Sequence, residues 1–116
     1  MKYITRYRVS CKSTNLIYCI SCNTCGKQYV GQTKRRLMDR FQGHFYNISS
    51  GNHEDTIGRH FGKADHNGLQ DVKIHILDFI KHVPDSQMAS QARDRCELKW
   101  IHRLNTVAPR GLNLMD

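Results

Sequence analysis

A Cys-x-x-Cys-Gly turn at residues 22–26 separates two stretches, 16–20 and 27–31, whose apolar residues alternate as they do in β-strands. Tyr18 lies in the first stretch and Tyr29, eleven residues later, lies in the second. Because glycine accommodates a tight turn, we expect the two stretches to pair as an antiparallel hairpin. The chain must therefore fold around a hairpin that carries two phenols on its strands and two thiols at its tip.

Apolar periodicity along the rest of the chain predicts two helices and a third strand. The helical segments that we expect are a helix N-capped by Thr33, with Leu37, Phe41, Phe45 and Ile48 toward the core and residues 49–52 at its end, a short turn of helix at 56–61, and a longer helix at 86–104. The apolar side of the longer helix holds Ala89, Ala92, Cys96, Trp100 and Leu104. The remaining segments are a loop at 64–68, a half-buried strand at 72–76 and a closing turn at 109–111. The resulting order, β-β-α-β-α, belongs to the α+β class.

The length of the chain limits the number of domains that it can form, and its charge limits the kinds of partner that it can bind. With 116 residues, we expect one domain over 1–116, with a core of about 14–114. No apolar run approaches the ~20 residues of a membrane span, and the first residues lack the apolar segment of a signal peptide, so we expect no membrane partner. The 18 Lys+Arg against 10 Asp+Glu favour a phosphate backbone as the partner, with an acidic protein or an anionic membrane surface as alternatives.

Cationic side chains follow the second predicted strand. Lys34, Arg35 and Arg36 come first, and Arg40 and His44 follow at helical spacing. Residues four apart lie on one face of a helix, so Arg36, Arg40 and His44 form a polar stripe beside the apolar one. Guanidinium groups suit phosphate because they donate two hydrogen bonds to it. A solvated helix face is the alternative interpretation.

Glu97 lies in the predicted helix at 86–104, next to Cys96, which we expect to be an ordinary core residue. The carboxylate has two interpretations. It could pair with Arg93, one turn away on the same helix. It could instead be a ligand of Mg²⁺, an ion that takes one or two carboxylates together with waters and phosphate oxygens.

The order and spacing of a set of residues resemble the motifs of the GIY-YIG nuclease superfamily: Tyr18, Tyr29, Gly31, Arg40, His44, Glu97 and Asn113. The resemblance covers residues 15–113. The expected β-β-α-β-α order suits that family's small, mainly antiparallel three-stranded sheet flanked by helices. The chain departs from the family at two places: the first motif reads Leu16-Ile17-Tyr18 and lacks the glycine of the family, and the second reads Tyr29-Val30-Gly31.

The resemblance implies a metal-dependent endonuclease that hydrolyses phosphodiester bonds of DNA and cuts one strand. Tyr18 or Tyr29 would take the proton of the attacking water, and Arg40 would hold the scissile phosphate. Glu97 would bind Mg²⁺, or Mn²⁺, at the side of the leaving group. His44 would be a second phosphate contact or a general acid or base, and Asn113 would support the site.

A tyrosine base needs help from a neighbouring cation, because an unperturbed phenol titrates at about 10. Arg40 or the bound metal would provide that cation. The other contacts with DNA that we expect come from cationic residues: Lys34, Arg35, Arg36 and Arg110.

A narrower resemblance is to the endonuclease domain of Penelope-like retroelements. It rests on the cysteine pair inside the hairpin, on His60 and His66, and on the ending from Trp100 to Asn113. It implies a nuclear enzyme that nicks DNA for retroelement integration, with a reverse-transcriptase domain or protein as its partner. The alternatives are a structure-specific DNA repair nuclease and a catalytically silent zinc module that only binds nucleic acid.

The two hairpin thiols need two further ligands to complete a tetrahedral metal site. Five cysteines without a secretory signal indicate a reducing compartment, where Cys-x-x-Cys binds metal more often than it forms a disulfide. We expect a structural Zn²⁺ to pin the hairpin tip to the 60–66 segment, with these ligands: Cys22, Cys25, His60 and His66. One alternative is a pair of reduced thiols without metal. Another is a site made of thiols alone: Cys11, Cys19, Cys22 and Cys25.

Overall fold

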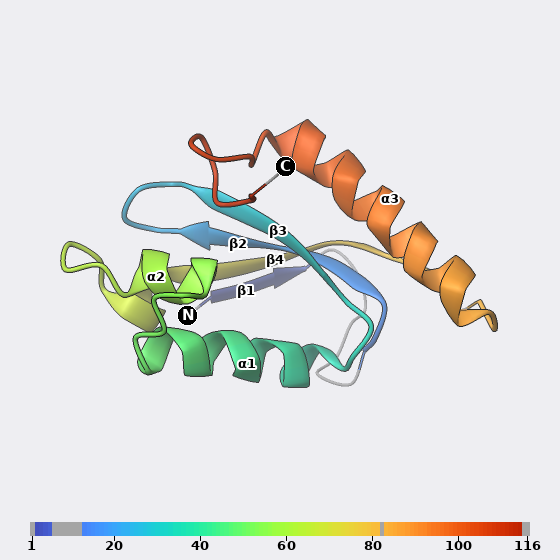
Figure 1. Ribbon diagram of the computed structural model, residues 1–116, viewed down its shortest axis with the longest axis horizontal. Helices are drawn as coiled ribbons and strands as arrows, with labels where there is room; N and C mark the ends of the chain where they lie inside the picture. Colours follow the sequence, from blue (N-terminus) through green and yellow to red (C-terminus); the bar gives the residue numbers. More distant parts are fainter. Residues whose placement is uncertain (1, 6–12, 82, 115–116) are drawn as a thin grey trace.

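The computed structural model describes residues 2–5, 13–81 and 83–114. Its elements follow the chain in this order: β1 (Lys2–Thr5), β2 (Leu16–Cys22), β3 (Gln28–Thr33), α1 (Leu37–Ser49), α2 (Thr56–Phe61), the 3₁₀ turn η1 (Gly68–Asp71), β4 (Val72–Phe79) and α3 (Ser86–Leu104). One sheet lies between α1 and α2 on one side and α3 on the other (Figure 1). This arrangement confirms the expected α+β class.

Strand β2 is the centre of the antiparallel part of the sheet. It pairs antiparallel with β3 on one side and with β4 on the other, so the expected three-stranded sheet is present. Strand β1 adds a fourth strand at the edge, parallel to β4, and the order becomes β1-β4-β2-β3. The sequence analysis assigned no strand to residues 2–5, because an alternation cannot be read over so short a segment.

The predicted hairpin is confirmed, with strands slightly longer than expected. The backbone N–H of Gly26 donates to the carbonyl of Cys22 at 2.8 Å. Gly26 has φ of +78°, a left-handed conformation that glycine adopts without the steric penalty of a side chain. Glycine therefore closes the turn that brings the two thiol residues and the two strands together.

The side chains of β2 alternate between two hydrophobic clusters on the two faces of the sheet. Leu16, Tyr18 and Ile20 belong to the larger cluster, which includes the apolar stripe of α1. Ile17 belongs to the smaller cluster, together with Ile101 of α3. Because both faces are covered, this central strand is buried from residue 16 to residue 20, and it carries the Tyr18 phenol into the interior.

The prediction that Thr33 caps the first helix is wrong. Thr33 is the last residue of β3, and its hydroxyl oxygen accepts the backbone N–H of Arg35 at 3.0 Å. This local turn satisfies the hydroxyl before the helix begins. Helix α1 starts at Leu37, after Arg36 at the N-cap position, so the cations at 34–36 lie in the connection and not in the helix.

Helix α3 has the bounds that were predicted for it. The Asp85 carboxylate accepts the backbone N–H groups of Gln87 and Met88 at its start, and Asn105 ends it with φ of +56°. Among the described residues, no helix combines the length and the apolar composition that crossing a bilayer requires.

Candidate active site and metal centre

The Tyr18 ring lies directly over Gly31, its partner on β3. A Cβ atom added to Gly31 would lie 2.5 Å from Cζ of Tyr18, closer than real atoms approach. Only glycine therefore leaves room for the phenol at this position. Tyr18 itself is 0% exposed, packed edge-on against the ring of Phe41 with 5.1 Å between the centroids.

The hydroxyl of Tyr18 is held between two side chains of α1. Nε of Arg40 donates to it at 3.1 Å, and Nε2 of His44 lies 2.8 Å from it. Burial, followed by the charge of Arg40, lowers the pKa of His44 to about 4, so this imidazole is neutral near pH 7. Burial raises the pKa of Tyr18 above its usual value although Arg40 opposes the change. The phenol is therefore protonated, and it shares a hydrogen bond with the imidazole nitrogen.

Tyr29 lies on the same side of the hairpin and is half-buried. Burial raises the pKa of this phenol too, whereas the Arg40 guanidinium lowers it and the Glu97 carboxylate raises it. Its ring centroid is 6.3 Å from that of His44. Arg40 thus lies near both phenols, and it alone does not bring either of them to a pKa at which the phenolate would prevail.

Glu97 reaches the same place from α3. Burial raises the pKa of its carboxyl, and a hydrogen bond from Gln32 of β3 together with the charge of Arg40 lowers it. The same carboxylate influences the pKa of both phenols. Two strands and two helices therefore bring together the groups that the sequence analysis singled out: Tyr18, Tyr29, Arg40, His44 and Glu97.

The ion pair of Glu97 with Arg93, the alternative interpretation, is not among the ion pairs of the described residues. Arg93 instead donates from Nε to the amide oxygen of Gln32 at 3.1 Å and from Nη1 to that of Asn15 at 2.8 Å. None of the ion pairs of the described residues therefore engages the Glu97 carboxylate.

An open cleft of about 320 Å³ lies beside these groups. The residues that line it are mostly cationic: Gln32, Thr33, Lys34, Arg35, Arg40 and Arg93. Lys34 and Arg35 are among the predicted DNA contacts. Arg36 lies outside this lining and pairs with Asp39 at 3.0 Å. Arg110 is exposed in the C-terminal turn and is not part of the cleft either.

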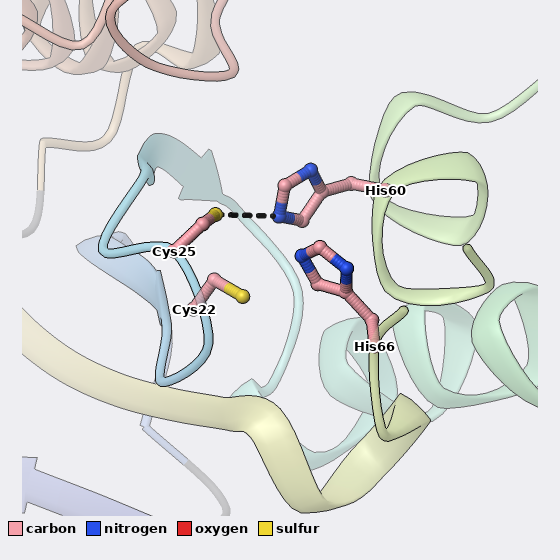
Figure 2. A group of neighbouring side chains, drawn as sticks. All are labelled: Cys22, Cys25, His60 and His66. Carbon is pink, nitrogen blue, oxygen red and sulfur yellow. Dashed lines mark hydrogen bonds between the residues drawn. The ribbon is translucent and has the colours of Figure 1, made fainter. Parts of the chain in front are cut away.

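A second cluster gathers at the hairpin tip, where four side chains each turn one ligand atom toward a common centre (Figure 2). The cluster consists of the predicted zinc ligands: Cys22, Cys25, His60 and His66. All four ligand atoms lie within 4.8 Å of one another, and Sγ of Cys25 is 3.4 Å from Nε2 of His60. A tetrahedral site with bonds of about 2.0–2.3 Å separates its ligand atoms by about 3.3–3.8 Å. Small side-chain adjustments would reach that geometry.

Each of the two imidazoles has a nitrogen atom that a metal ion could bind. Nε2 of His66 is buried without a hydrogen-bond partner, and its Nδ1 lies 2.8 Å from the Asp65 carboxylate, which fixes the orientation of the ring. Burial, and then the neighbouring His66 and Lys63, lower the pKa of His60 to about 4, so its ring is in the neutral form that binds metals. The donor set, two thiols and two imidazoles, is that of a structural zinc site.

Hydrogen bonds outside the cluster attach the hairpin tip to the segment before β4. The hydroxyl of Thr24 donates to the Asp71 carboxylate at 2.8 Å, and the backbone N–H of Asn23 donates to the Asp71 carbonyl at 2.9 Å.

The alternative set of four thiols includes Cys19, which is buried on β2 and lies 3.8 Å from the Ser21 hydroxyl. Because side chains alternate along a strand, Cys19 and Cys22 point to opposite faces of the sheet. Cys11 lies outside the described residues.

Comparison with known proteins assigns this chain to a family. A model of the GIY-YIG catalytic domain matches residues 14–113. The chain belongs to the GIY-YIG family of catalytic domains.

Two solved structures have the same fold as this GIY-YIG domain. The catalytic domain of the homing endonuclease I-TevI is 26% identical, with a TM-score of 0.61 over 86% of this chain and 97% of that one. A glutamate-to-alanine variant of the catalytic domain of intron endonuclease I-TevI is also 26% identical, with a TM-score of 0.65 over 86% of this chain and 92% of that one. No curated protein matches the chain. The family makes the chain an enzyme of the endonuclease class.

Asn113 occupies a supporting position in this GIY-YIG domain. Its side chain accepts the backbone N–H of Val30 and donates to the carbonyl of the same residue, both at 2.9 Å, and it accepts the Thr106 hydroxyl at 2.7 Å. All of its polar atoms are engaged in fastening the C-terminal turn to β3 between Tyr29 and Gly31. These hydrogen bonds agree with the supporting role that the sequence analysis gave to Asn113, whose place in the catalytic set stays a prediction.

Three residues that line the cleft were not predicted to be part of the site: Gln32, Thr33 and Arg93. Gln32 follows Gly31 and bonds to groups of α3, and Arg93 lines the cleft. A signal existed for Arg93, since it precedes Glu97 by one helical turn and therefore shares its face. Gln32 had none, because a polar residue at the end of a strand is common.

Proposed function

We propose that this GIY-YIG domain is a metal-dependent DNA endonuclease that nicks one strand by hydrolysing a phosphodiester bond. The observation that carries the proposal is the convergence of two phenols, the Arg40 guanidinium and the Glu97 carboxylate at the edge of a cationic cleft. Binding nucleic acid requires only the cations. The buried phenol with its imidazole partner and the half-buried carboxylate are groups that hydrolysis uses and binding does not.

Arg40 is the residue that we propose for the scissile phosphate. It is half-buried, it lines the cleft, and it already donates a hydrogen bond next to the phenols. A guanidinium fork can contact a phosphate with two N–H groups and stabilise the additional negative charge of the pentacovalent state. Lys34 and Arg35 would attract the DNA backbone and hold it next to the reacting group.

The proton of the attacking water needs a path, and Tyr18 with His44 supplies one. The phenol can pass its own proton to the neutral Nε2 of His44, 2.8 Å away, as its oxygen takes the proton of the water. Because Tyr18 is covered in this structure, the Arg40 side chain has to turn toward the phosphate before water can reach the phenol. Tyr29 is the alternative base, since it is half-buried and also lies near Arg40.

Glu97 is the residue that we propose as the single carboxylate ligand of a Mg²⁺ or Mn²⁺ ion. It is half-buried beside the cleft and, among the described residues, has no ion-pair partner. Magnesium commonly takes one or two carboxylates and completes its shell with waters and substrate oxygens. The metal would supply stabilisation of the charge on the leaving 3′ oxygen. The high pKa of Glu97 from burial indicates a carboxylate whose charge a cation would stabilise.

The structural zinc of the hairpin tip belongs to the same proposal. Supporting observations are the four converging ligand atoms and the buried, unpartnered Nε2 of His66. The zinc would hold the tip against the 60–66 segment. Since Tyr18 and Tyr29 lie on the two strands that the turn joins, it would also restrain both phenols.

A retroelement enzyme is our finer proposal for the biological role. Its support is the cysteine pair within the hairpin, the two histidines and the Trp100-to-Asn113 ending, which resemble the endonuclease domain of Penelope-like retroelements. A reverse-transcriptase partner and a nuclear location follow only from that resemblance. A structure-specific repair nuclease uses the same chemistry and is the alternative role.

A plasmid-nicking assay with Mg²⁺ tests the activity. We expect the wild-type protein to convert supercoiled plasmid to the open circular form, and Glu97→Gln to lose this activity by about 100-fold or more. Glu54→Gln, the same change at an exposed loop residue, is the matched control and should nick at the wild-type rate. Full nicking by Glu97→Gln would contradict the metal assignment. If the wild-type protein binds DNA with a steep salt dependence and does not nick it, the silent binding module is the correct function.

A further inference from the structure

Arg93 of α3 is a buried arginine without an acidic partner among the described residues. It is only 8% exposed, yet none of the ion pairs of those residues includes it. The groups that bind it are neutral amide oxygens, from Gln32 at 3.1 Å and from Asn15 at 2.8 Å. Arginine is rarely buried to this extent unless its charge is paired. A counter-ion is therefore expected at the guanidinium.

The two amides orient Arg93 rather than neutralise it. Asn15 has a left-handed backbone at φ of +55° just before β2, and its carbonyl accepts the backbone N–H of Ile80, so its place is defined. Gln32 lies on β3 and also donates to the Asp94 carboxylate at 2.8 Å. The side chains of Asn15, just before β2, and Gln32, on β3, thus orient the Arg93 guanidinium that lines the cleft.

None of the described residues that line the cleft beside Arg93 is acidic, which favours a phosphate as the missing partner. The other charged residues that line the cleft are Lys34, Arg35 and Arg40, and all are cations. Like charges gathered in one cleft repel each other, and an anionic occupant removes that cost. A guanidinium in fixed orientation is also the group that recognises phosphate oxygens with directed hydrogen bonds.

We propose that Arg93, with Lys34 and Arg35, forms a second phosphate-binding subsite that holds the DNA backbone phosphate next to the one being cut. The inference rests on the proposed function, in which Arg40 takes the scissile phosphate. Gln32 bonds to Arg93 and also contacts Glu97, so a phosphate held at Arg93 is linked through one amide to the orientation of the metal-binding carboxylate. Arg93 touches the substrate but not the reacting atoms.

The test compares three variants of the full chain on the same plasmid and on a labelled DNA duplex. Arg93→Gln removes the charge, Arg93→Lys keeps the charge without the guanidinium geometry, and Arg95→Gln removes one charge from an exposed position of the same helix. We expect Arg93→Gln to raise KM about tenfold and to leave kcat within about threefold, since uniform binding is lost. Arg93→Lys should be intermediate, and Arg95→Gln should resemble the wild type.

The salt dependence of duplex binding gives an independent readout. Loss of one phosphate contact lowers the slope of log K against log salt by about 1, so Arg93→Gln should show that change and Arg95→Gln should not. Equal KM values and equal slopes for Arg93→Gln and Arg95→Gln would overturn the subsite, and a lowered melting temperature alone would assign Arg93 to stability. These binding data report on the subsite even if the wild-type protein fails to nick, an outcome that counts against the proposed function instead.

If Arg93→Gln does not fold, a DNA substrate with one neutral phosphate can test the subsite instead. A methylphosphonate placed next to the mapped cleavage position should weaken DNA binding by the wild-type protein about tenfold. It should weaken DNA binding by Arg93→Lys less, because the lysine has already lost the guanidinium part of the contact. Equal weakening of both proteins would refute a contact between Arg93 and that phosphate.

Discussion

The cationic cleft and the hairpin-tip cluster are both built around the β2–β3 hairpin, but they are assembled differently. The tip takes two ligands from one turn and two from a short segment of α2 and the loop after it. The cleft takes its groups from two strands and two helices that are distant along the chain. The tip thus depends on local spacing, whereas the cleft exists only when α1 and α3 have both packed on the sheet. Damage to the cleft should therefore leave the tip intact, whereas damage to the tip should reach the cleft through the hairpin that they share.

Removal of Arg40 should have the largest effect and should be confined to the cleft. Arg40→Ala removes the proposed contact with the scissile phosphate and also the N–H group that donates to the Tyr18 hydroxyl. We therefore expect the nicking rate to fall by about 100- to 1,000-fold. Single-turnover plasmid nicking measures the rate, and metal analysis should give the wild-type zinc content. A loss of less than about threefold, or a parallel loss of zinc, would contradict the separation of the two regions.

Loss of the metal should affect the tip first and the cleft through the hairpin. We expect Cys25→Ser, or prolonged treatment with a chelator, to remove the zinc and to lower the melting temperature by more than about 5 °C. Nicking should fall by about tenfold because both phenols lie on the released strands. Cys96→Ser is the control, since this thiol donates to Asp78 at 3.3 Å far from the cluster and a hydroxyl can replace it. A zinc-free wild-type protein of unchanged stability would refute the structural metal.

Acid should destabilise the cleft through His44. Its pKa is about 4 in the folded protein and about 6.5 when unfolded, so below pH 6.5 the unfolded state binds more protons and stability falls until about pH 4. Between pH 7 and pH 5 this contributes a loss of about 2 kcal/mol in the free energy of unfolding. Denaturant titrations at the two pH values should show a smaller loss for His44→Gln. An identical loss in both proteins would mean that His44 is not buried in its neutral form.

The smallest effect expected is that of one methyl group at the cleft. Gly31→Ala forces Tyr18 to move, because the new Cβ would overlap its ring, and should cost about 1–3 kcal/mol of stability together with part of the activity. Gly43→Ala is the matched control on α1, where no atom lies within 4 Å of the added Cβ, and it should be neutral or stabilising by about 0.5–1 kcal/mol. Chemical denaturation distinguishes the two. If Gly31→Ala behaved as Gly43→Ala does, the close contact with the phenol would be disproved.

Features with a short period or a short spacing were predictable from the sequence. The hairpin, the apolar stripe of α1 and the bounds of α3 follow from alternation, helical repeat and a turn glycine, all of which act over a few residues. The cluster of possible metal ligands could be named because two thiols in one turn need two further ligands, and His60 and His66 have a suitable spacing. The start of α1 was misplaced because Thr33 has a hydroxyl that serves equally well in a local turn at the end of a strand.

The sequence by itself determined which local elements form and which chemical groups the chain carries. Only the tertiary structure decided that Tyr18 is covered by Arg40 and His44, that Asn113 fastens the C-terminal turn to β3, and that Arg93 has no acidic partner among the described residues. These outcomes depend on contacts between residues as much as 83 positions apart, as between Val30 and Asn113. Local patterns do not encode such contacts, because burial and charge environment are set by the packing of the whole sheet with its helices.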